Sequence, residues 1–119
     1  MKISIPISVG ELLDKITILQ IKVKNTESSH VREELDHLIS IAKHHEVYEK
    51  KYLDDLLKVN KKLWEIEDCL RESERSQKFD DEFISLARGV YVNNDERYEI
   101  KRKINEETSS YYREIKIHK

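Results

Sequence analysis

Residues 8–23, SVGELLDKITILQIKV, contain both a helix start and a helical stripe, and they decide the fold. Ser8 lies three residues before Glu11, which is the spacing of a capping box at a helix N-terminus. Apolar residues then recur every three or four positions, as on one face of an α-helix. They are Val9, Leu12, Leu13, Ile16, Leu19 and Val23. This stretch therefore predicts a helix from Val9 to about Asn25.

The predicted helix has a second apolar side, which carries Ile18 and Ile21. A helix with two apolar faces lies at the centre of a bundle or packs against a second subunit. A later helix is also long for the core of so small a chain. We therefore predict a homodimer with a symmetric helical interface.

Three further helices are predicted downstream. The first follows the cap candidates Ser28 and Ser29 and fades at His44 and His45. The next carries apolar residues from Tyr48 to Leu70, spans about 28 residues and would be about 42 Å long. No glycine or proline separates these two, so one bent helix is the alternative. The last runs from Asp81 to about Glu107, after a cap at Asp80.

The two ends of the chain alternate between apolar and polar residues, as short strands do. Residues 1–6 contain Ile3 and Ile5 in alternation, and residues 111–117 contain Ile115 and Ile117. The expected fold class is therefore all-α. It is an elongated hairpin or bundle of about four helices, with a possible short two-stranded pairing of the terminal segments. The whole chain, 1–119, is expected to form a single domain.

Composition narrows the choice of partners. The chain has 119 residues, of which 39% are charged, with 22 cations against 24 anions and a net charge of −2. This balance gives no general attraction to nucleic acid or to an acidic membrane. No apolar run approaches the roughly 20 residues of a membrane span, and the start lacks a signal-peptide core. We expect a cytoplasmic protein without nucleic-acid or membrane partners.

Polar residues occupy positions on the two long helices where the apolar stripe predicts leucine. A buried charge is costly unless it is paired, so we expect Glu67 to face Lys101 or Arg97. A bound anion facing the cations would satisfy the same rule. The alternative is that this polar seam, meaning the polar residues on the stripes of the two long helices, is solvated or purely structural. The candidate ligand-binding residues are Lys15, Asn60, Glu67, Arg71, Asn94, Asp95, Arg97 and Lys101. Glu67 or Asp95 would be the acid–base or orienting group.

The sequence does not predict a metal site. Glu46 and Glu49, followed by Glu65 and Asp68, fit the carboxylate pattern of all-α pyrophosphohydrolases that bind Mg²⁺. However, 24 acidic residues in 119 make such matches frequent. His30, His37 and His44 share one face of the second helix, and each is over 10 Å from the next by helix rise, too far for one metal. We expect no cofactor.

Several segments carry a resemblance to a known family. They are VGELLDKITILQIK (9–22), NKKLWEIED (60–68), FISLARGVY (83–91), NDER (94–97) and KRKIN (101–105). Together they resemble a family of small bacterial and phage proteins with no assigned function. Its motif positions fall on Glu11, Asp14, Lys15, Lys22, Asn60, Trp64, Glu67, Asp68, Arg71, Arg88, Tyr91, Asn94, Asp95, Arg97 and Lys101. The resemblance implies that the polar seam belongs to the family pattern, and it names no substrate.

Two hypotheses of function follow. The first is a non-enzymatic, oligomeric helical interaction or accessory protein that binds itself or another protein. The second is a binding protein or small enzyme for an anionic metabolite or sugar nucleotide. Its polar site would lie between the first, third and fourth predicted helices. We favour the first. The chain has no glycine-rich phosphate loop and no organised nucleophile, which argues against a P-loop enzyme and a nucleophilic hydrolase.

Overall fold

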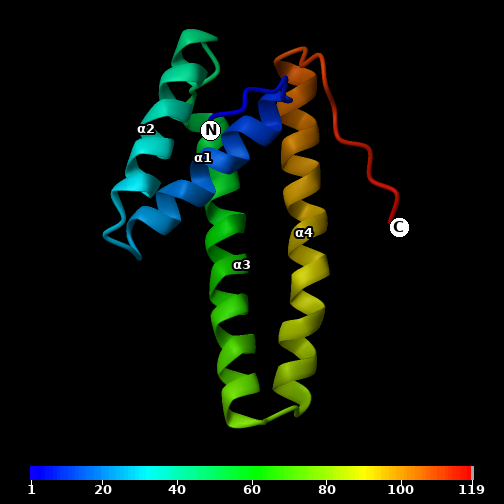
Figure 1. Cartoon of the computed structure of the whole chain (residues 1–119). Coiled ribbons are helices and arrows are strands. Elements are labelled where there is room, and N and C mark those ends of the chain that lie inside the picture. The colour runs from blue at the N-terminus through cyan, green and yellow to red at the C-terminus, as the bar shows by residue number, and fades with distance from the viewer. Residues whose placement is uncertain (119) are drawn as a thin grey trace.

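The computed structural model describes residues 1–118 and contains four α-helices in that range (Figure 1). They are α1 (Val9–Val23), α2 (Ser29–His44), α3 (Lys50–Ser76) and α4 (Asp81–Glu107). The all-α fold class is therefore confirmed. The predicted bounds of the last helix are confirmed, and α1 ends two residues earlier than predicted.

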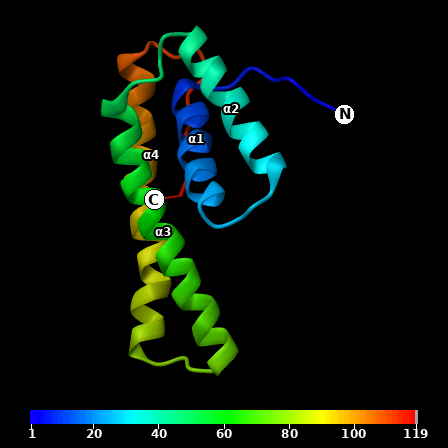
Figure 2. The same cartoon turned by 90° about the vertical axis from the view of Figure 1, so that its left-hand side faces the viewer.

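The helices form two layers of unequal length. α3 and α4 are antiparallel neighbours of 27 residues each, which corresponds to about 40 Å. α1 contacts all three other helices, whereas α2 contacts only α1. α1 and α2 lie on one side of the α3–α4 hairpin and cover only the half of it near the chain termini (Figure 2). The far half of the hairpin therefore projects without a second layer.

Helix caps explain where two of the helices start. The Ser8 side chain accepts a hydrogen bond from the Glu11 amide at 3.1 Å, and Asp80 accepts one from the Phe83 amide at 3.2 Å. α2 and α3 are separate helices, because the chain turns between them at Glu46, which has a φ of 59°. The left-handed conformation there interrupts the helical hydrogen-bond ladder, so the bent-helix alternative does not occur.

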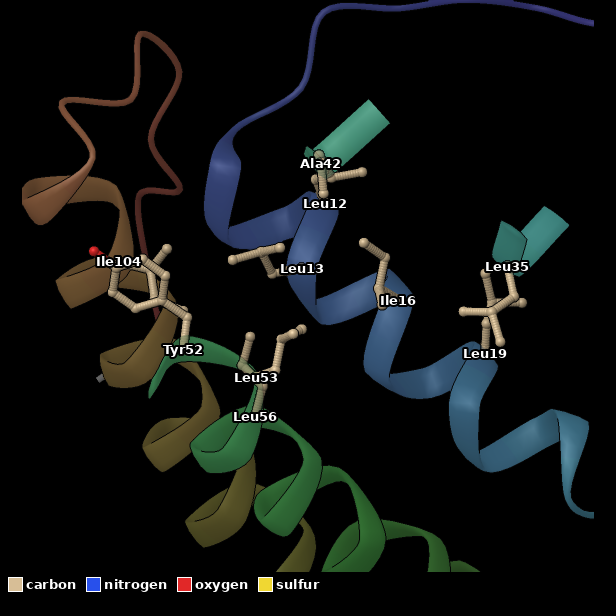
Figure 3. Close-up of a cluster of buried hydrophobic side chains, with 10 residues drawn as sticks. All are labelled: Leu12, Leu13, Ile16, Leu19, Leu35, Ala42, Tyr52, Leu53, Leu56 and Ile104. Carbon is tan, nitrogen blue, oxygen red and sulfur yellow. The ribbon is translucent and has the colours of Figure 1, made fainter. Parts of the chain in front are cut away.

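The apolar core lies where α1 crosses the hairpin. Leu13, Ile16 and Leu56 are completely buried. Figure 3 shows these side chains within a cluster drawn from all four helices. Its members are Leu12, Leu13, Ile16, Leu19, Leu35, Ala42, Tyr52, Leu53, Leu56 and Ile104. The stripe predicted for the first helix thus supplies the centre of the core.

The predicted pairing of the two terminal segments does not form. Residues 1–118 contain no strand, and the two ends run along different parts of the molecule (Figure 1). The C-terminal segment follows α4, where Lys116 pairs with Asp95 at 2.9 Å. The N-terminal segment borders a groove with α2. Side-chain contacts with helices therefore outweigh the weak alternation of the two ends, and Ile3, Ile5, Ile115 and Ile117 remain exposed.

The second apolar side of α1 packs inside the chain. Ile21 is only 6% exposed, and Ile18 is half-buried beside Trp64 of α3. The second apolar side of α1 is therefore used largely within the bundle, and Ile21 offers no exposed surface for the predicted subunit interface. Among the described residues, no helix is both long and apolar enough to span a membrane.

Candidate functional site

A buried charge network joins three helices at the middle of α1. Asp14 is completely buried, and its carboxylate accepts hydrogen bonds from Asn60 of α3 and Arg97 of α4. The Asn60 Nδ2 and Arg97 Nε atoms are each 2.9 Å from Asp14 Oδ1. Arg97 Nη2 donates to Oδ2, so the guanidinium and carboxylate form a two-bond pair. This geometry fixes the crossing of α1 over the hairpin.

The other polar groups of the network complete its hydrogen bonds. Thr17 Oγ1 accepts from Asn60 Nδ2 at 2.9 Å and donates to the Asp14 carbonyl at 2.8 Å. Arg97 Nη1 lies 3.4 Å from the Asn94 side-chain oxygen. The hydrogen bond to Asp14 raises the pKa of Arg97 despite its partial burial. The Arg97 guanidinium therefore stays charged at any physiological pH.

A cleft of about 460 Å³ opens beside this network, between α1 and the hairpin. Its walls come from the C-terminal half of α1 and the facing sides of α3 and α4. The lining residues are Ile18, Ile21, Asn60, Leu63, Trp64, Glu67, Asp68, Arg71, Val90, Asn94 and Arg97. Five of the eight candidate residues predicted from sequence therefore meet at one cleft.

The remaining candidates lie elsewhere. Lys15 is exposed and borders the groove along the N-terminal segment. Asp95 pairs with Lys116 of the C-terminal segment, and the Lys116 ammonium also lies 5.6 Å from the centre of the Tyr98 ring. Lys101 joins α1 to the C-terminal segment. The predicted site was therefore too broad, because it combined different faces of the bundle.

The predicted partner of Glu67 was also wrong. Glu67 lies at the exposed mouth of the cleft, 3.7 Å from Arg71. Lys101 instead contacts Glu11 at 3.2 Å and Glu114 at 3.0 Å. An ammonium with two carboxylate partners is already neutralised, which removes Lys101 as a free cation for an anionic ligand.

We expect the substitution Lys101→Met to lower the free energy of unfolding by about 1 kcal/mol. The Lys101 side chain is 8% exposed and makes two charge-assisted hydrogen bonds, which methionine cannot make. The loss stays modest because Glu11 and Glu114 are both partly exposed and can be hydrated instead. Urea titration followed by circular dichroism measures this difference, and a gain in stability would contradict it.

Sequence reasoning missed Asp14 as the centre of the site. A signal was present, because Gly10, Asp14, Thr17 and Ile21 recur at spacings of four, three and four residues. That spacing places them on one helix face. The face was recognised from Ile18 and Ile21, but its polar members were not assigned to it.

Comparison with known proteins places the chain in a family. No curated protein and no solved structure matches it. A family model matches residues 1–119, which agrees with the resemblance to a family without an assigned function. The chain belongs to the family of unknown function DUF6165.

Proposed function

We propose that this protein is a non-enzymatic helical interaction module that forms a homodimer through the outer face of its α3–α4 hairpin. The observation that carries the proposal is that this face, opposite α1, is covered by no other described helix (Figure 2). Domains are built from at least two packed layers, because a layer of helices cannot bury its apolar side chains alone.

The far half of the hairpin has apolar side chains but no core. In α3 no residue beyond Asn60 is buried, and in α4 no residue before Asn93 is buried. Ile84 and Val92 are each 53% exposed and line an outer groove of about 660 Å³ with Ile66. A second helical layer would cover these side chains and stabilise the projecting hairpin.

A second copy of the chain has the right dimensions to be this layer. The outer face is about 40 Å long and, for two helices side by side, roughly 20 Å wide. It therefore offers about 800 Å², which is one partner's share of a standard interface. Two hairpins packed face to face form a four-helix bundle, which is a common stable arrangement.

The outer face carries charges of both signs at each of its ends. The groove near the chain termini is lined by Lys51, Asp55, Lys103 and Glu107, and the groove near the far end is lined by Lys62, Asp81 and Arg88. Each end therefore offers both carboxylates and cations to a second copy, and these charges do not select between a parallel and an antiparallel arrangement.

We expect the wild-type protein to have the mass of a dimer at tens of micromolar, and Val92→Asp to have the mass of a monomer. A carboxylate at the centre of the interface would be desolvated without a partner. Val92 is half-exposed in the free protomer, so the helix tolerates the change. Light scattering coupled to size exclusion measures both masses.

Tyr91→Asp provides the matched control. Tyr91 is 55% exposed, adjacent to Val92, and does not line the outer groove. This variant should remain a dimer. A wild-type protein of monomer mass would contradict the proposal, and so would equal dissociation by the two substitutions.

A further inference from the structure

Several polar groups at the cleft between α1 and the hairpin lack hydrogen-bond partners within residues 1–118. Asn60 is 5% exposed, and its Nδ2 is fully used, but its Oδ1 accepts no hydrogen bond. No side-chain oxygen or nitrogen that is buried from solvent lacks a partner in the described part of the chain. Asn60 Oδ1 must therefore reach the cleft, as an acceptor at its floor.

Donors lie beside this acceptor. The Asn94 side-chain oxygen faces Arg97, and its Nδ2 makes no hydrogen bond in the described part of the chain. Arg97 is held by Asp14 through Nε and Nη2, which leaves Nη1 with only the 3.4 Å contact to Asn94. An arginine fixed in this way is already oriented for a ligand, so binding costs little side-chain entropy.

The charges around the cleft do not favour an anion. Its cations are Arg71 and Arg97. Its carboxylates are Glu67 and Asp68, with Asp14 directly beneath. The sum is −1, and Arg97 is already neutralised by Asp14. A free phosphate or carboxylate would therefore meet no excess of positive charge.

Trp64 gives the cleft an aromatic wall. Its indole is half-buried and lies between this cleft and the neighbouring groove under α2. An indole offers an apolar surface together with a single N–H donor. An apolar wall facing fixed amide and guanidinium groups suits a ligand that has one apolar face and a polar edge.

We propose that this cleft binds a neutral sugar ring. The C–H face of the ring would lie on Trp64, and adjacent hydroxyls would bond to Asn60 Oδ1, Asn94 Nδ2 and Arg97 Nη1. A hydroxyl both donates and accepts, so neighbouring hydroxyls match this mixed set of groups. The site lies on the face opposite the proposed dimer interface and does not depend on it.

Trp64 is the only tryptophan in the chain, so intrinsic fluorescence reports on this cleft directly. The test is a titration of the full-length protein with glucose, mannose, galactose and N-acetylglucosamine. At least one should change the Trp64 emission saturably below roughly 50 mM, which covers millimolar affinity. Inorganic phosphate and citrate should leave the emission unchanged.

Variants test whether the binding uses the cleft. Asn94→Ala should weaken the affinity for the sugar that binds by at least about tenfold, because a hydroxyl of the bound sugar is left without its partner. Arg71 lines the cleft and Arg75 does not, so Arg71→Ala should weaken sugar binding more than Arg75→Ala does. These two arginines are matched, because both are exposed in α3 and both pair with a glutamate of their own helix.

Three results would overturn the proposal. They are no emission change with any of the four sugars, a saturable change with phosphate, or an unchanged affinity in Asn94→Ala. Failure of the sugar proposal can be distinguished from failure of the homodimer proposal. Val92→Asp removes the dimer interface and should leave the sugar titration unaltered. If Val92→Asp abolished the fluorescence response, the cleft would not be an independent site.

Discussion

Asp14→Asn is expected to lower the free energy of unfolding by about 3 kcal/mol, which is near the lower end of the range of costs for breaking a buried ion pair. The replacement keeps the shape of the side chain but removes the charge that neutralises Arg97. It also turns one acceptor of the two-bond pair into a donor that faces another donor. The loss is not larger because the Arg97 side chain is 26% exposed and regains some hydration. Urea denaturation followed by circular dichroism measures it.

An exposed ion pair of similar type serves as the control. Asp54 pairs with Lys50 one helical turn away, and both side chains are more than half exposed. Asp54→Asn should therefore change stability by less than about 0.5 kcal/mol. The double variant Asp14→Leu with Arg97→Met should recover much of the loss, because it removes both charges together. Equal effects at Asp14 and Asp54 would show that burial of the carboxylate contributes nothing.

Local signals in the sequence were sufficient to predict the helices. The caps at Ser8 and Asp80 and the near absence of glycine and proline placed α1 and α4 within two residues. These features act over one or two helical turns, so they can be identified without knowing the fold. The turn at Glu46 could not be predicted in this way, because glutamate has no preference for the left-handed conformation found there.

The arrangement of the helices and the ends of the chain depends on contacts distant in sequence. The terminal segments alternate like strands, but Glu114 and Lys116 of the C-terminal segment pair with Lys101 and Asp95 of α4 instead. Alternation predicts which residues can face one side, and it does not identify the surface that a segment reaches.

The candidate site was predicted in part for the same reason. Asn60, Asn94 and Arg97 were found because polar residues on an apolar stripe are costly unless satisfied. The partner predicted for Arg97 or Lys101 was Glu67, because polar residues on an apolar stripe were found only on the two long helices. The carboxylate comes instead from Asp14, 83 residues before Arg97. Helical periodicity carries no information on which helix crosses that seam.

Gly10→Ala is expected to destabilise the protein by about 1–3 kcal/mol, although alanine favours helix formation. An added Cβ at Gly10 would lie 2.9 Å from the Lys101 backbone oxygen and 3.0 Å from Asn105 Oδ1. The backbone of α4 cannot rotate away as a side chain can. The substitution must push α1 from α4 and stretch the hydrogen bond from the Gly10 amide to Asn105, which is 2.7 Å long.

Gly89→Ala separates this clash from the general effect of a glycine in a helix. The nearest atom to an added Cβ there is the terminal methyl of Ile66, at 3.2 Å. That methyl can move by a few tenths of an ångström, and the helix gains roughly 1 kcal/mol in propensity. Gly89→Ala should therefore leave stability unchanged or slightly higher in the same urea titration. If the two variants lost equal stability, the contact between α1 and α4 at Gly10 would not be the cause.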